Sequence, residues 1–203
     1  MSTPRHIAEA DTLREQHAAR AERIRAKPEL SDHGRAMLLA RNYLDAKSKM
    51  AELEQTARAD DNAQRTRSER AAFGTGGLPG DPATVAVSYR DAQDRAAAIT
   101  SSTDAAALLA RAERSGDEPL ARAVAGQAHD QSSNGLGALD SGWQHVLDSY
   151  TASRPRAALD VNTLRDLSGS TSMRDLFTHV LATPPELSRI PASQLAALAD
   201  AAP

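Results

Sequence analysis

The fold is decided by residues 31–57, which read SDHGRAMLLARNYLDAKSKMAELEQTA. Six apolar side chains recur there at intervals of 4, 3, 4, 3 and 4 residues: Leu39, Tyr43, Ala46, Met50, Leu53 and Ala57. This heptad spacing lays a narrow apolar stripe along one side of a helix, and such a stripe needs another helix to cover it. We call these six residues the seam. The pattern predicts a helix that begins after an N-cap at Ser31 and runs to about Ala72.

The segment before the seam predicts a shorter helix over residues 5–27. Its apolar side carries Ile7, Ala10, Leu13, His17, Ala21 and Ile24. Pro28 stops this helix, because proline disfavours the helical conformation at the preceding residue and has no N–H to donate. The connection to the seam helix is short, which favours an antiparallel, coiled-coil-like hairpin over residues 1–73. Since the second helix is much longer, we expect the first to cover only part of the seam and to leave the rest for another chain.

A glycine- and proline-rich stretch at residues 74–82 interrupts the helical periodicity and predicts a linker. Asp81 and Pro82 form an N-cap and first-turn pair that starts the next helix. The seam spacing returns there in Val85, Tyr89, Ala92, Ala96 and Ile99. Further helical segments, including 104–115, 119–130, 161–167 and 173–181, predict a small helical domain over residues 83–183. Residues 184–203 are expected to be a tail, in which 191–202 form either a last amphipathic turn or disordered chain.

Composition supports an all-α fold and excludes several functions. No segment has a convincing strand pattern, and much of the 40% apolar content is alanine, the best helix former. Aromatic residues make up only 3% of the 203 residues, so thin helical layers are expected rather than a thick core. The absence of cysteine excludes disulfides, thiolate metal sites and thiol catalysis. The N-terminus lacks the apolar segment of a secretion signal and no apolar run is long enough to cross a membrane, which predicts a cytoplasmic protein without membrane contact.

No pattern in the chain indicates catalysis or ligand binding. The six histidines lack close metal-ligand spacing. The serines lack the G-x-S-x-G elbow of hydrolases. Residues 74–80 are superficially similar to a phosphate-binding loop but lack its terminal Gly-Lys-Ser/Thr. We therefore expect no catalytic residue, no cofactor and no metal, and a protein that is not an enzyme.

Three aromatic residues in the C-terminal region are candidate interaction residues: Trp143, Tyr150 and Phe177. They can anchor a small core, or some of them can be exposed anchors for a partner, since interface hot spots favour Trp and Tyr. The sequence leaves both alternatives open.

The run from Arg23 to Arg35, followed by Tyr43 and Ala46, resembles small helical virion-assembly and structural proteins of actinobacterial tailed phages and prophages. In those proteins a helix ends at a short Pro/Asp-Leu-Ser/Thr turn and a second charged helix follows. The resemblance covers residues 10–57. It implies a scaffolding or head-assembly role and a location in the host cytoplasm or the virion, although this chain is less acidic than a typical scaffolding protein.

The sequence thus favours a non-enzymatic structural or assembly protein that self-associates through the seam or binds another structural protein. The alternative is a nucleic-acid-associated regulator that contacts phosphate through basic residues of the second helix, Arg58, Arg65, Arg67 and Arg70. Acidic residues are interspersed among them, and the net charge of −3 comes without a clustered basic face, which argues against nucleic acid as a partner.

Overall fold

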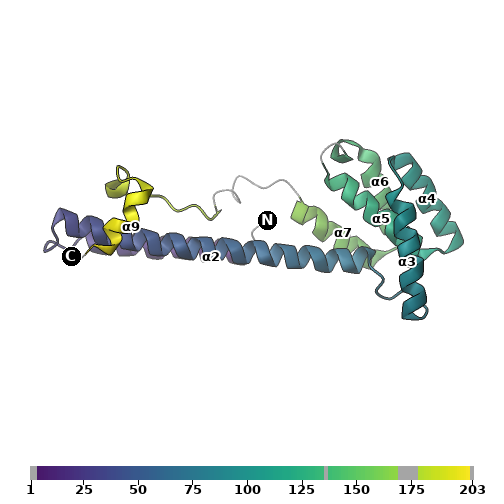
Figure 1. Ribbon diagram of the computed structural model, residues 1–203, viewed down its shortest axis with the longest axis horizontal. Coiled ribbons are helices and arrows are strands. Elements are labelled where there is room, and N and C mark those ends of the chain that lie inside the picture. The colour runs from purple at the N-terminus through teal and green to yellow at the C-terminus, as the bar shows by residue number, and fades with distance from the viewer. Residues whose placement is uncertain (1–3, 135–136, 169–177, 202–203) are drawn as a thin grey trace. The chain divides into compact units, whose positions relative to one another are not determined.

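The computed structural model describes residues 4–134, 137–168 and 178–201, and these residues form helices and no strand (Figure 1). The protein is therefore all-α, as predicted. The α-helices are α1 (Pro4–Arg25), α2 (Asp32–Phe73), α3 (Pro82–Ala97), α4 (Ser102–Ser115), α5 (Glu118–Ser133), α6 (Ser141–Ala152), α7 (Pro155–Ser168) and α9 (Ala192–Asp200). Two short 3-10 helices are η1 (Gly137–Leu139) and η2 (Pro185–Leu187).

The chain divides into two compact units at positions that differ from the expected ones. Unit 1 comprises residues 1–61 and 170–203, and unit 2 comprises residues 62–169. The division falls within α2 rather than in the segment 74–82, because Ala72 and Phe73 at the end of this helix are buried in the core of unit 2. Residues 184–201, expected as a tail, belong to unit 1.

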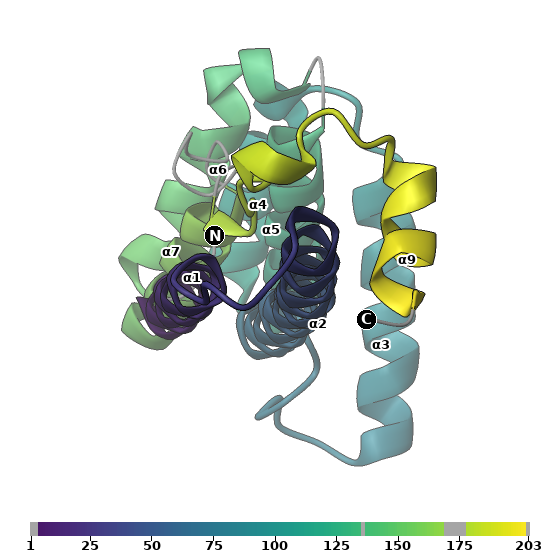
Figure 2. The ribbon, with the colours of Figure 1, turned by 90° about the vertical axis from the view of Figure 1, so that its left-hand side faces the viewer.

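Unit 1 is built on a pairing of α1 with the first part of α2, seen nearly end-on in Figure 2. The Asn42 side-chain nitrogen lies 2.9 Å from His17 Nδ1, and His6 Nε2 lies 3.1 Å from an oxygen of Asp60. These contacts make the two helices antiparallel. They also correct the expectation that α1 is too short for the seam: its 22 residues span about 33 Å, the length of α2 from Leu39 to Asp60.

The C-terminal segment packs on the same hairpin. Leu187 of η2 is fully buried, and Leu195 and Ala199 of α9 are 6% exposed. They share a cluster with five residues of the hairpin: Ala21, Ile24, Leu39, Ala40 and Tyr43. An apolar helix of nine residues gains more by covering this surface than by remaining in water, and this is the reason that the segment is not a tail.

Arginines of the hairpin fix the C-terminal segment in place. Arg25 donates to both carboxylate oxygens of Glu186, at 2.6 and 2.9 Å. Arg41 donates to the backbone oxygens of Ala199 and Ala201 in and after the last turn of α9. The last carbonyls of a helix have no intrahelical partner, so Arg41 acts as a C-terminal cap from outside the helix.

Unit 2 is a helical bundle with α5 at its centre, packed against α3, α4 and α6, while α7 packs on α6 (Figure 1). The predicted start of α3 is confirmed: the Asp81 carboxylate accepts hydrogen bonds from the N–H groups of Ala83 and Thr84 at 3.0 and 3.1 Å. Gly116 ends α4 with a φ of 68°, a left-handed conformation that glycine adopts without strain. Short helices with capped ends thus form a compact core.

Candidate interaction surfaces

The seam is buried inside unit 1. Leu39, Tyr43, Ala46, Met50 and Ala57 are 0–7% exposed, and Leu53 is half-buried. Tyr43 also packs its ring against His17, with centroids 6.2 Å apart, and its hydroxyl accepts a hydrogen bond from Thr183. That the seam binds another chain stays a prediction, but its side chains already have partners within unit 1.

Leu53 marks the edge of this buried stripe. It borders an open groove of about 430 Å³ between α1 and α2, together with Leu13 and the stems of charged residues such as Arg5 and Lys49. The groove is the part of the seam region that solvent still reaches.

Two of the three candidate aromatic residues belong to the core of unit 2. Trp143 is 3% exposed and Tyr150 is 1% exposed, whereas Phe177 lies outside the described residues. Burial raises the pKa of Tyr150 to about 12, so its phenol stays protonated and donates a 2.7 Å hydrogen bond to the backbone oxygen of Ala72. Trp143 and Tyr150 therefore serve the fold, which was the first of the two alternatives.

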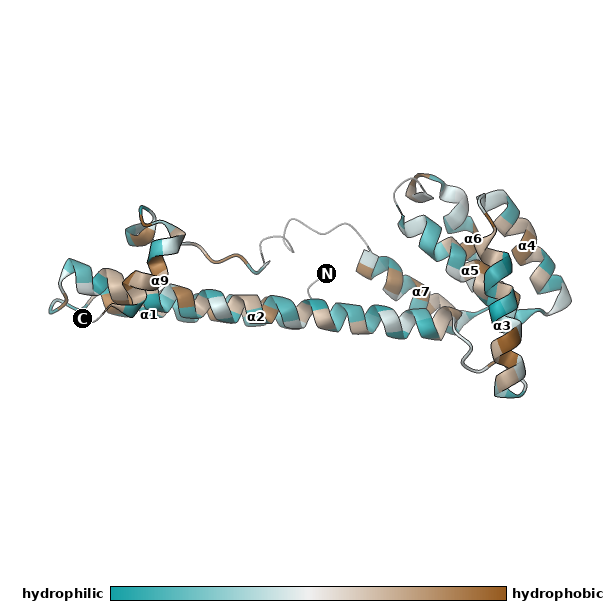
Figure 3. Ribbon diagram, in the orientation of Figure 1, coloured by the Kyte–Doolittle hydropathy of each residue, from teal (hydrophilic) through white to brown (hydrophobic). Residues whose placement is uncertain are grey.

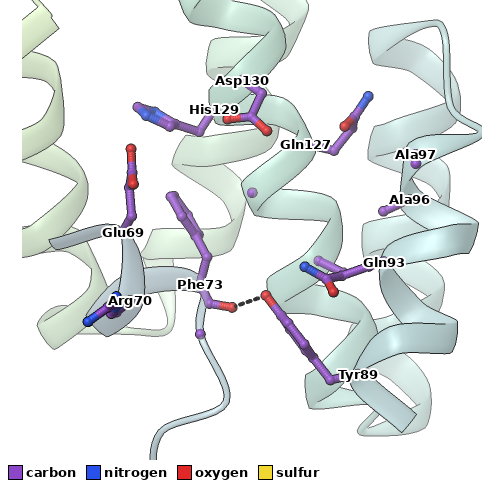
Figure 4. A pocket seen from close by; sticks show the side chains of 13 residues that line it. Glu69, Arg70, Phe73, Tyr89, Gln93, Ala96, Ala97, Gln127, His129 and Asp130 are labelled. Carbon is purple, nitrogen blue, oxygen red and sulfur yellow. Dashed lines mark hydrogen bonds between the residues drawn. The ribbon is translucent and has the colours of Figure 1, made fainter. Parts of the chain in front are cut away.

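The C-terminal end of α2 is held by three polar side chains of unit 2. Besides Tyr150, Tyr89 donates to the backbone oxygen of Phe73 at 2.6 Å (Figure 4). Arg122 donates to the backbone oxygens of Gly74 and Gly76 at 2.6 and 2.7 Å. These groups satisfy carbonyls at the end of α2 and in the segment just after it.

A charge network lies beside this cap. The Arg154 guanidinium stands 4.5 Å from the centre of the Tyr150 ring and donates to Glu118 and Glu113 at 2.6 Å. Burial alone would raise the pKa of Glu118, but hydrogen bonds from Arg154 and Arg122 outweigh it and hold that pKa below its usual value. The network is built for stability, because each member is bonded to another member.

A groove of about 400 Å³ opens between α3, α5 and the end of α2 (Figure 4). The amides of Gln93 and Gln127 flank it, and the Phe73 ring packs on His129 with centroids 5.6 Å apart. Burial lowers the pKa of His129, so the imidazole is neutral at pH 7. Among the described residues that line the groove, the hydroxyl of Tyr89 is already bonded and there is no serine or threonine. Besides these amides and apolar contact, the groove offers the ionisable side chains of Glu69, Arg70 and Asp130.

An exposed apolar surface of unit 2 lies on the first half of α3, which is brown in Figure 3. Val87 is 67% exposed, and Ala83 and Ala86 on the same side of the helix are also exposed. We call these three residues the apolar patch. The sequence pattern identified only the inner stripe of this helix, in which Ala92 and Ala96 are buried, as is Ile99 just after the helix. The outer face was missed because a single valine among alanines gives little periodic signal.

Most basic residues of the nucleic-acid alternative are engaged within the chain. Arg58 pairs with Glu54 at 2.5 Å, Arg67 donates to Gln64, and Arg65 donates to Ser168 and to the backbone oxygen of Leu167. Phosphate binding would have to replace these contacts, so the free energy that it gains through these side chains would be smaller.

Within the described ranges, no three residues of the types His, Asp and Glu are grouped so that they could hold a metal ion. No described helix combines the length and the apolar character needed to cross a membrane. No match to this chain emerges from comparison with protein-family models, with curated proteins or with solved structures.

Proposed function

We propose that this protein is a non-enzymatic structural or assembly protein that associates with copies of itself through a helical surface. The resemblance of residues 10–57 suggests the head assembly of a tailed phage as the setting. We place this contact on α3, because most of the seam is buried within unit 1.

One observation carries the proposal: the apolar patch is exposed on a helix that a packed core holds in place. A contiguous apolar surface on a rigid element is typical of protein–protein contact. The seam and the C-terminal segment have a supporting role, since they stabilise unit 1.

Light scattering coupled to size-exclusion chromatography tests the proposal. We expect the mass of the full chain to rise with concentration, and Val87→Ser to reduce this rise. Leu159→Ser is the matched control, because Leu159 is 71% exposed but lies on α7, and it should leave the mass unchanged. A monomeric mass for the unaltered chain up to high micromolar concentration would overturn the proposal.

A further inference from the structure

We infer that α3 pairs antiparallel with α3 of a second copy, about a two-fold axis, in a register that places Arg90 opposite Asp94. This inference rests on the proposed self-association and names the surface and geometry that produce it.

The first argument is a stripe along the outer face of α3. Ala83, Val87, Arg90, Asp94 and Ala97 follow one another at intervals of 4, 3, 4 and 3 residues, and all five are exposed. At about 100° per residue these positions fall on one side of the helix, opposite the inner stripe that packs on α5. We call these five residues the outer stripe. It has the spacing of a helix–helix contact, and α3 has α5 as its main packing partner within unit 2.

The second argument is the charge of the outer stripe. Asp91 and Arg95, which lie beside it, pair with each other at 3.7 Å, and Arg95 also approaches Asp117. Arg90 and Asp94 have no ion-pair partner among the described residues, although they are four residues apart on the same helix. Arginine before the acidic residue is the less favourable order for a pair within a helix, so both charges remain available for a partner chain.

The third argument selects a second copy as the occupant. With Arg90 opposite Asp94 of the second copy, the two-fold axis repeats the contact, so two ion pairs form. The same register places Val87 opposite Ala97 of the second copy, and the two-fold axis repeats this contact as well. A parallel, in-register pair would instead place Arg90 beside Arg90 and Asp94 beside Asp94. The small side chain of Ala97, which faces Val87 in this register, lets the helix axes approach to the usual distance of about 8–10 Å.

The expected dimer is weak and sensitive to salt. Exposed ion pairs contribute little individually, and salt screens them. Measurement therefore belongs at low ionic strength and at concentrations up to the high micromolar range.

Sedimentation velocity of the full chain, with charge-reversal variants, tests the register. Arg90→Glu places Glu opposite Asp94 at both contacts, and Asp94→Arg places Arg opposite Arg90. Each should weaken the dimer by about tenfold, since two attractive contacts become repulsive. The double variant R90E/D94R should recover the dissociation constant of the unaltered chain. An equimolar mixture of the two single variants should form a heterodimer, in which both contacts join opposite charges.

Arg114→Glu on α4 is the control, because Arg114 is also exposed but lies outside the outer stripe of α3. It should leave the dimer unchanged. Far-ultraviolet circular dichroism and Trp143 emission check that each variant is folded. The mixing experiment gives a further check, because two single variants that do not associate alone can form a heterodimer together only if both are folded.

The outcomes separate this inference from the proposed function. If the unaltered chain stays monomeric, both fall. If it associates but Arg90→Glu and Asp94→Arg leave association unchanged, or if neither the double variant nor the mixture recovers it, only the α3 register is overturned.

Discussion

Replacing Tyr150 by Phe removes a single hydroxyl from the core of unit 2. This hydroxyl donates a 2.7 Å hydrogen bond to the backbone oxygen of Ala72, and both residues are 1% exposed. The carbonyl lies in the last turn of α2, where no helical N–H can replace the lost donor. Since water cannot reach the site, the substitution removes a hydrogen bond and also leaves a buried acceptor unpaired. We expect a loss of about 1–3 kcal/mol in the free energy of unfolding of unit 2.

Urea unfolding followed by tryptophan emission measures this loss. Trp143 is the only tryptophan of the chain and is buried in the same core, so its signal reports on unit 2. Tyr89→Phe is the matched control, because Tyr89 also donates to a backbone oxygen of α2 but is only half-buried. Water can replace its hydroxyl, and the loss should stay below about 1 kcal/mol. Equal losses for the two variants would refute the reasoning that burial of the acceptor sets the cost.

Three further predictions concern pH and the C-terminal segment. Burial lowers the pKa of His129, so unit 2 should be fully stable above the ordinary histidine pKa of about 6.5 and lose stability as pH falls toward the lowered value. His129→Gln should flatten this dependence when urea midpoints from Trp143 emission are compared between about pH 7.5 and 5. The hydrogen bond from Arg25 lowers the pKa of Glu186 to about 2. The ionised Glu186 should therefore add to the free energy of unfolding of unit 1 above about pH 4.5, and this contribution should be lost as pH falls toward 2. Glu186→Gln should abolish this pH dependence, measured by hydrogen exchange of the η2 amides. Leu187→Ala removes a fully buried side chain and should cost about 2–5 kcal/mol, measured as faster exchange of η2 and α9 amides; unchanged exchange would contradict the packing of this segment on the hairpin.

Local signals in the sequence predicted much of the fold. Asp81 and Pro82 marked the start of α3 because an N-cap acts within three residues of itself, and Ser31 likewise accepts a hydrogen bond from the Gly34 N–H at 3.0 Å. Pro28 separated the two helices of the hairpin. The antiparallel direction followed from the short connection between α1 and α2.

Long-range contacts were outside the reach of these signals. No local pattern indicates the partners of Arg25 and Arg41, which lie 161 and 158 residues away in the chain. Leu195 and Ala199 are spaced by four residues, a weak pattern that does not say which surface covers them. The coverage of the seam could have been predicted, since helix length alone shows that α1 reaches Asp60.

The candidate surface was predicted least well. The strong periodicity of the seam indicates a helix side that must be buried, and here residues of the same chain bury it. The outer stripe of α3 has the same spacing but mixes Ala83 and Val87 with Arg90 and Asp94, so its hydrophobic pattern is faint. Only the exposure of Val87 in the folded unit distinguishes it.

The order of segments in unit 1 has a consequence for how the chain is made. Unit 1 is discontinuous: unit 2 is inserted between residue 61 and residue 170. During synthesis the hairpin emerges first, but Leu187, Leu195 and Ala199 can cover Leu39 and Tyr43 only after the whole of unit 2 has been translated. Unit 2 can fold on the ribosome, because all of its core lies within one stretch of chain. Unit 1 therefore becomes complete only after unit 2 has been made, and until then the part of the hairpin around Leu39 and Tyr43 that Leu187, Leu195 and Ala199 later cover stays exposed.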